Sequence, residues 1–129
     1  MSETNLENTG ETKIDFAKMD GLVPGIVQDA KTGRVLMVGF LNETSYQKTL
    51  ETGFVTFWSR TRQKLWMKGE TSGNRLHILD AATDCDNDTL LFRVEVEGDG
   101  LVCHEGTVSC FTRRIALPAA TASVAGEVR

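Results

Sequence analysis

The chain has 129 residues, of which 40% are hydrophobic and 25% are charged, and it contains only two prolines. This length suits a single domain, and the composition argues against a disordered chain, a collagen-like repeat or a low-complexity array. The net charge of −4 disfavours a general nucleic-acid binder, which carries an excess of basic residues. We therefore expect no nucleic-acid partner.

No segment has the character of a membrane span or an export signal. The longest uncharged apolar run, residues 35–41, is about a third of the roughly 20 residues that cross a bilayer. Residues 1–13 are polar and lack a basic start followed by an apolar stretch, which predicts a cytoplasmic protein without membrane contact. We expect residues 1–13 to be a flexible lead, residues 14–115 to be the domain and residues 116–129 to be a tail.

The first half of the chain predicts a hairpin and a short helix. Two apolar, β-branched runs, residues 23–29 and 34–40, flank a polar loop with Gly33 near its end, as in a β-hairpin. Asn42 is the expected N-cap of a helix, Tyr46, Thr49 and Leu50 have helical spacing, and Gly53 ends it.

The second half is dominated by strand patterns. Residues 54–58 predict one strand and residues 64–68 a further one, closed by the turn-rich residues 69–74. Residues 75–82 and 89–97 alternate with period two, and residues 98–100 form the next turn. The prediction is an α+β fold: a strand-dominated, compact domain with one or two short helices and no βαβ alternation.

Charge is divided unevenly between two neighbouring segments. Residues 54–75 carry five basic side chains against Glu70 alone, a net +4, whereas residues 80–99 carry seven acidic side chains against Arg93 alone, a net −6. A polyanionic small ligand on the first segment and cations on the second would explain this division. Two solvated faces that merely differ in charge are the alternative.

The run Asp84-Cys85-Asp86-Asn87-Asp88 is the densest cluster of metal-binding side chains. If the run is extended, the three aspartates share one face and Cys85 takes the other. Oxygen ligands suit Mg²⁺, and a thiolate suits Zn²⁺. A calcium EF-hand loop is disfavoured because Thr89 stands where that loop needs glycine. An acidic turn without a metal stays open.

Cysteine chemistry points to a metal rather than to disulfides. Cys85, Cys103 and Cys110 are an odd number in a chain without an export signal. Three protein ligands leave the open coordination position of a catalytic zinc. His104, beside Cys103, carries an imidazole, the side chain best suited to proton transfer at neutral pH. Unrelated buried cysteines and a structural histidine are the alternatives.

Residues 58–75 combine rings, cations and hydroxyl groups with glycines that let backbone N–H groups approach an anion. The candidate substrate-binding residues are Trp58, Ser59, Arg60, Arg62, Trp66, Lys68, Thr71, Ser72, Gly73 and Asn74. The segment is not a Walker P-loop, because it lacks the closing Gly-Lys-Ser/Thr. An exposed basic hairpin with buried tryptophans is the alternative.

Taken in order, these blocks closely resemble the phosphoribosyl-AMP cyclohydrolase family of histidine biosynthesis. The matching blocks are G-L-V-P-G-I-V-Q-D (21–29), V-L-M-V-G-F-L-N (35–42), F-W-S-R-T-R (57–62), L-W-M-K-G-E-T-S-G-N (65–74), D-C-D-N-D (84–88) and C-H-E-G with S-C-F (103–106 and 109–111). The length resembles the stand-alone form, without the phosphoribosyl-ATP pyrophosphohydrolase domain that some relatives carry downstream.

The resemblance implies a zinc- and magnesium-dependent hydrolase that acts as a homodimer. It implies opening of the adenine ring of phosphoribosyl-AMP between N1 and C6, the third step of histidine biosynthesis, which gives the phosphoribosyl-formimino-aminoimidazole carboxamide ribotide. The zinc ligands of the family, shared between subunits, map onto Cys85, Cys103 and Cys110, and the magnesium ligands map onto Asp84, Asp86 and Asp88.

Our hypothesis assigns His104 as the general acid–base of this reaction, because three thiolates reduce the acidity that zinc confers on water. We also expect both ions to flank one cavity. The rival from another class is a non-catalytic, zinc-stapled nucleotide-binding module with His104 or another group as the fourth zinc ligand.

Overall fold

The computed structural model describes residues 13–118 and contains, within them, six strands and one α-helix. The elements are β1 (Val23–Asp29), β2 (Val35–Leu41), α1 (Glu43–Thr52), β3 (Thr56–Ser59), β4 (Lys64–Met67), β5 (Leu76–Thr83) and β6 (Leu90–Val96). The strand-dominated α+β prediction is therefore confirmed. Most of the expected lead, residues 1–12, and most of the expected tail, residues 119–129, lie outside the described residues.

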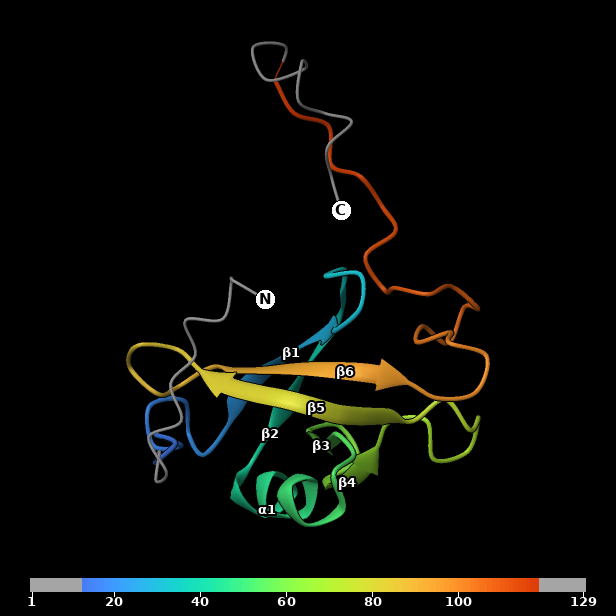
Figure 1. The fold of residues 1–129 in the computed structure, drawn as a ribbon. Coiled ribbons are helices and arrows are strands. Elements are labelled where there is room, and N and C mark those ends of the chain that lie inside the picture. Colours follow the sequence, from blue (N-terminus) through green and yellow to red (C-terminus); the bar gives the residue numbers. More distant parts are fainter. Residues whose placement is uncertain (1–12, 119–129) are drawn as a thin grey trace.

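Four strands form the main sheet, in the order β2-β1-β6-β5 (Figure 1). The β1–β2 and β5–β6 pairs are antiparallel, whereas β1 and β6 run parallel, from Gly25 opposite Leu90 to Asp29 opposite Val94. The sequence did not reveal this parallel pairing, because 60 residues lie between the end of β1 and the start of β6 and no βαβ pattern links the two strands. Strands β3 and β4 form a separate two-stranded hairpin.

The predicted β1–β2 hairpin is confirmed, with β2 beginning one residue later than expected. Its turn forms because the Asp29 carboxylate accepts hydrogen bonds from the backbone N–H groups of Lys31, at 2.8 Å, and Thr32, at 3.2 Å. Gly33 follows with a φ of 81° and donates its N–H to the Asp29 carbonyl.

Helix α1 begins and ends where the sequence predicts. The Asn42 side chain accepts a hydrogen bond from the Ser45 N–H at 2.8 Å, Ser45 Oγ accepts from the Asn42 N–H at 3.0 Å, and Gly53 closes the helix with a φ of 79°. The buried face of the helix agrees with the predicted spacing at Thr49, which is fully buried together with Ser45, but not at Leu50, which is 54% exposed. Thr49 Oγ1 accepts a hydrogen bond from the Thr56 N–H at 2.9 Å, which ties the helix to β3.

The hydrophobic core lies between the main sheet and the β3–β4 hairpin. Its largest fully buried side chains are Phe57, Phe92, Leu36, Leu41 and Leu76. Val102, 2% exposed, anchors the segment after β6 in this core. Among residues 13–118 the structure has no helix with the length and apolar character needed to cross a bilayer.

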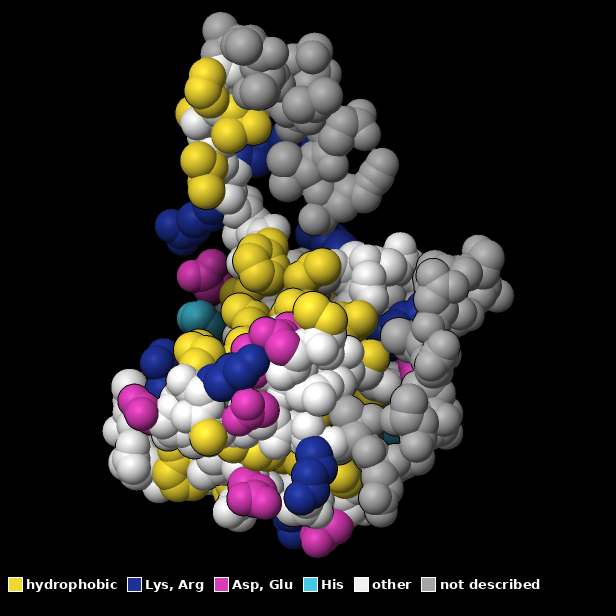
Figure 2. Space-filling model, turned by 90° about the vertical axis from the view of Figure 1, so that its left-hand side faces the viewer, with side chains coloured by type: hydrophobic (Ala, Val, Ile, Leu, Met, Phe, Trp, Pro, Cys, Tyr) yellow, Lys and Arg dark blue, Asp and Glu magenta, His cyan; other side chains and the backbone are white. Residues whose placement is uncertain are grey.

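The segment after β6 ends in an extension that leaves the body of the protein (Figure 1). Hydrophobic side chains are visible along its outer part (Figure 2). Phe111 is 57% exposed, Ile115 83% and Leu117 53%. This extension therefore presents apolar surface that the described part of its own chain does not cover.

Candidate active site

Two groups of candidate functional residues lie beyond opposite ends of strand β6. The β5–β6 turn, residues 84–89, contains the three aspartates and Cys85, whereas Cys103, His104 and Cys110 follow the strand. Seven residues of strand span about 20 Å. Within one chain, the acidic run and the two later cysteines are therefore far apart (Figure 1).

The three aspartates converge, although not through an extended strand. Residues 84–88 form a turn in which Asn87 has a φ of 63°. The carboxylate of Asp84 accepts hydrogen bonds from the backbone N–H groups of Asp88, at 3.0 Å, and Thr89, at 3.3 Å. One carboxylate oxygen from each aspartate lies within 4.8 Å of the others, the only such cluster of metal-binding side chains within residues 13–118. We call residues 84–89 the acidic loop.

The carboxylates of the acidic loop differ in proton affinity. Desolvation raises the pKa of Asp84. Hydrogen bonds from the backbone N–H groups of Asp88 and Thr89, together with the side chains of Asp88 and Asp86, outweigh it and hold that pKa below its usual value. For Asp88, desolvation and the neighbouring carboxylates of Asp84 and Asp86 raise the pKa, although Lys18 opposes them. Carboxylate oxygens are the ligands that a hard cation such as Mg²⁺ prefers.

Lys18 also reaches the acidic loop, which sequence analysis missed. Its ammonium lies 3.1 Å from an Asp86 carboxylate oxygen and 3.4 Å from one of Asp88, and the hydrogen bond to Asp86 is the largest cause of the raised pKa of Lys18. Lys18 lies 68 residues before Asp86, so no local spacing pattern could indicate the contact.

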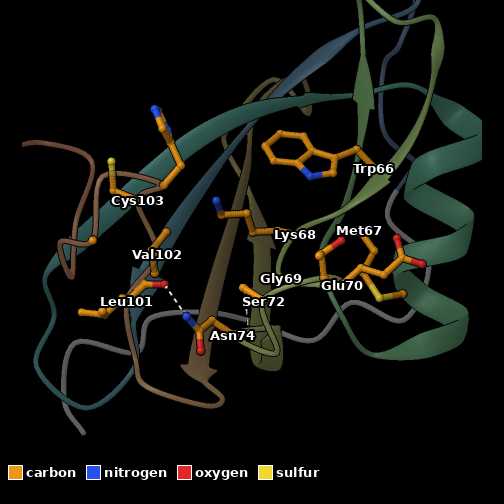
Figure 3. A pocket seen from close by; sticks show the side chains of 13 residues that line it. Trp66, Met67, Lys68, Gly69, Glu70, Ser72, Asn74, Leu101, Val102 and Cys103 are labelled. Carbon is orange, nitrogen blue, oxygen red and sulfur yellow. Dashed lines mark hydrogen bonds between the residues drawn. The ribbon is translucent and has the colours of Figure 1, made fainter.

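A cavity of about 430 Å³ lies at the other end of β6. It is formed where the end of β4 and the following turn face the segment after β6 (Figure 3). Its lining includes five of the predicted substrate-binding residues together with two residues of the predicted zinc and proton-transfer chemistry. These are Trp66, Lys68, Thr71, Ser72 and Asn74, with Cys103 and His104.

The cavity residues differ in what their side chains are free to bind. Trp66 is 41% exposed, and the Lys68 ammonium lies 5.4 Å from its ring centroid. Figure 3 shows both side chains directed into the cavity. Asn74 is only 8% exposed: its Nδ2 donates to the Leu101 carbonyl at 3.0 Å, and its Oδ1 accepts from the Asp99 N–H at 2.8 Å. Asn74 therefore fastens the two walls of the cavity together.

The thiols of Cys103 and Cys110 are close enough to influence each other's pKa. The backbone N–H of Glu105 is the largest influence on Cys103 and lowers the pKa of its thiol, whereas desolvation, followed by Cys103, raises the pKa of Cys110. A tight turn, in which the Gly106 N–H donates to the Cys103 carbonyl at 2.9 Å, holds the first thiol. The Cys110 N–H donates to the Leu36 carbonyl at 2.8 Å, which fixes the second against β2.

The other predicted substrate-binding residues do not line this cavity. They are Trp58, Ser59, Arg60, Arg62 and Gly73. The Arg60 guanidinium instead stacks 4.3 Å from the centroid of the Phe40 ring, and Ser59 Oγ accepts from the Arg62 N–H at 3.2 Å. The residues of β3 and the β3–β4 turn lie elsewhere because the hairpin presents only β4 and the turn after it to the cavity. Gly73 lies in that turn, between the lining residues Ser72 and Asn74, but does not itself line the cavity. Their role in binding stays a prediction.

The expectation that both metal groups flank one cavity is not met within a single chain. No residue of the acidic loop, Cys85 included, lines the cavity. Residues that the sequence did not single out, Leu101 and Val102 among them, complete the wall next to Cys103. They were missed because an apolar residue after a strand has no chemical signature.

Comparison with known proteins identifies the family. The family model described as phosphoribosyl-AMP cyclohydrolase matches residues 37–112. A phosphoribosyl-AMP cyclohydrolase from Solibacter usitatus is 59% identical over 102 residues, covering 79% of this chain and 80% of that protein. One from Streptococcus thermophilus is 56% identical, covering 78% and 88%. The histidine biosynthesis bifunctional protein HisIE of Escherichia coli is 57% identical over 77% of this chain, which corresponds to 48% of that longer protein. The chain therefore belongs to the phosphoribosyl-AMP cyclohydrolase family of histidine biosynthesis, a family of hydrolases.

Proposed function

We propose that this chain hydrolyses the N1–C6 bond of the adenine ring in phosphoribosyl-AMP, at a site that two subunits build together. The observation that carries the proposal is the cavity in which Trp66 and Lys68 face the segment bearing Cys103 and His104. An aromatic ring, a cation and hydroxyl groups suit a phosphorylated purine. Family membership favours an enzyme over the non-catalytic, zinc-stapled module.

The donor set fits a shared zinc ion. Each chain offers two neighbouring thiols, Cys103 and Cys110, at one end of β6 and a single exposed thiol, Cys85, at the other. Zinc bound by protein thiolates needs at least three protein ligands. Cys103 and Cys110 of one subunit together with Cys85 of the partner subunit supply three thiolates. One subunit alone cannot, because its own Cys85 lies beyond the opposite end of β6.

The same pairing brings the acidic loop into the site. Cys85 lies between Asp84 and Asp86, so a partner that contributes this thiol also brings its three carboxylates. These carboxylates would hold Mg²⁺, which prefers oxygen ligands and is commonly bound together with substrate phosphates. The expected single cavity flanked by both ions therefore requires a dimer.

In the proposed reaction, Trp66 stacks on the purine while Lys68, Thr71 and Ser72 bind a phosphate. Zinc, when bound, supplies Lewis-acid activation of water. His104 accepts a proton from the water as its oxygen bonds to C6. His104 then returns a proton to N1 as the N1–C6 bond breaks, which balances the reaction without a redox partner.

Turnover of phosphoribosyl-AMP, followed by the change in purine absorbance, tests the proposal. We expect zinc- and magnesium-dependent turnover by the wild-type protein, and a loss of about 100-fold or more in kcat for His104→Ala with zinc retained. The matched control is His77→Gln: His77 packs against Phe54, at 5.5 Å between ring centroids, and does not line the cavity. A loss of less than tenfold in His104→Ala would remove His104 from the proton transfer, and an inactive wild-type protein would refute the proposed reaction.

A further inference from the structure

Lys18 is held over the acidic loop by the backbone around it. The segment of residues 14–22, which we call the strap, joins the loop where the Asp15 N–H donates to the Asn87 carbonyl at 2.7 Å. The strap is folded on itself by the hydrogen bond from the Gly21 N–H to the Phe16 carbonyl, also 2.7 Å. Phe16 packs against Tyr46 of helix α1, with ring centroids 5.8 Å apart. The strap, anchored at these contacts, therefore positions the ammonium of Lys18 next to the carboxylates.

The position of this ammonium resembles that of a bound cation. Its Nζ atom contacts carboxylate oxygens of both Asp86 and Asp88 and lies 3.4 Å from the Asp86 carbonyl oxygen. Three carboxylates converge here, and like charges this close repel one another unless a cation lies among them. Lys18 reduces the local charge from −3 to −2.

We propose that Lys18 is the resident counter-cation of the acidic loop: it holds the carboxylates together before a divalent ion binds, and it competes with that ion. The proposal rests on the magnesium site of the proposed function. An ion that coordinates Asp86 and Asp88 competes with the ammonium, because the two cations repel each other and draw on the same two carboxylates. Lys18 therefore weakens divalent-ion binding while stabilising the ion-free loop.

Lys18 stabilises the acidic loop when no divalent ion is bound and destabilises it when the ion is bound. Without a divalent ion, removal of the ammonium leaves carboxylate repulsion uncompensated and destabilises the fold. With the ion bound, removal of the ammonium costs nothing and eliminates a repulsive charge. Replacement of Lys18 by methionine separates the effects, since methionine keeps an unbranched stem and lacks the charge.

The first measurement is a Mn²⁺ titration of zinc-loaded protein in magnesium-free buffer, with free Mn²⁺ measured by electron paramagnetic resonance. We expect Lys18→Met to bind Mn²⁺ about five- to tenfold more tightly than the wild type, as expected for loss of one nearby charge in a solvated site. Lys31→Met is the matched control, because Lys31 is an exposed lysine in the β1–β2 turn. We expect its affinity to equal that of the wild type.

The second measurement is the thermal unfolding midpoint with and without Mg²⁺. Lys18→Met should unfold at a lower temperature than the wild type in magnesium-free buffer, and this difference should disappear at saturating Mg²⁺. A merely structural role for the lysine would leave the same difference under both conditions.

The outcomes separate this inference from the magnesium site itself. The counter-cation role is overturned if Lys18→Met binds Mn²⁺ no more tightly than the wild type. The magnesium site still stands in that case, provided that the single variant Asp86→Asn binds Mn²⁺ more weakly than the wild type. If Asp86→Asn binds Mn²⁺ as the wild type does, or if the wild type does not bind it, the site and the inference both fail.

Discussion

At position 39, only glycine leaves room for the buried ring of Phe57. A Cβ atom on Gly39 would lie 2.6 Å from Cδ1 of that ring, which is 1% exposed and has no free space to move into. Gly39 sits in β2, and Phe57 sits in β3. This close approach sets how tightly the hairpin that leads to the cavity packs on the main sheet.

Gly39→Ala is therefore expected to destabilise the protein by about 1–3 kcal/mol through overpacking. The midpoint of urea-induced unfolding, measured at fixed zinc and magnesium, reports the loss. In the Phe57→Leu background the same substitution should cost clearly less, since the smaller side chain leaves space, and the two changes should be non-additive. Strict additivity would show that the two sites do not contact each other.

Individual residues also show which parts of the candidate site could be predicted from the sequence. The chemistry of Cys103, His104, Trp66 and Lys68 predicted a functional role for each, and the structure brings them to one cavity. The sequence predicted that the Asn74 amide binds substrate. In the structure, its nitrogen donates a hydrogen bond to one backbone group of the loop after β6, and its oxygen accepts one from another. Whether a polar side chain faces a ligand or its own backbone depends on contacts 25 or more residues away, which local spacing does not encode.

At the scale of elements, the sequence predicted the helix ends and the hairpin turn, which depend on residues close together in the chain. The capping residue Asn42, the closing Gly53 and the hairpin turn at residues 30–33 act over a few positions, and all three are confirmed. The parallel pairing of β1 with β6 and the exposure of Leu50 were not predicted. Both depend on which surfaces meet after the chain folds back.

Helix α1 offers a test of this local encoding. We expect Asn42→Ala to destabilise the protein by about 1 kcal/mol, because the Ser45 N–H loses its acceptor. Asn42→Ser is the matched control, since serine is an equally favourable N-cap, and it should remain close to the wild type. Urea unfolding measures both variants, and equal losses in the two would show that the cap contributes nothing specific.

For the whole molecule, the decisive feature is the separation of reactive groups by the length of β6. One chain carries two neighbouring thiols beyond one end of the strand and a thiol with three carboxylates beyond the other. The exposed apolar side chains of Phe111, Ile115 and Leu117 continue from Cys110. A second copy that covers this extension would lie beside the two-thiol end, where the proposed site needs its third thiol.

Mixing two inactive variants tests whether the site is built from two subunits. Cys85→Ser removes the thiol that a subunit gives to its partner, and His104→Ala removes the proposed proton-transfer group from its own cavity. In a shared arrangement, a mixed dimer contains one site in which the thiol comes from the His104→Ala subunit and the histidine from the Cys85→Ser subunit. Random pairing of equal amounts should therefore restore about a quarter of the wild-type sites.

Co-expression of the two variants under separate affinity tags allows the mixed dimer to be isolated and its turnover of phosphoribosyl-AMP measured. Two co-expressed copies of the same variant, carrying the two tags, serve as the control and should stay inactive. If the proposed dimer shares zinc, chelation of zinc from the wild-type protein should also convert it toward monomer on size exclusion, because the ion would bridge the subunits. A mixed dimer as inactive as its parents would mean that each chain completes its own site, which the distance along β6 argues against.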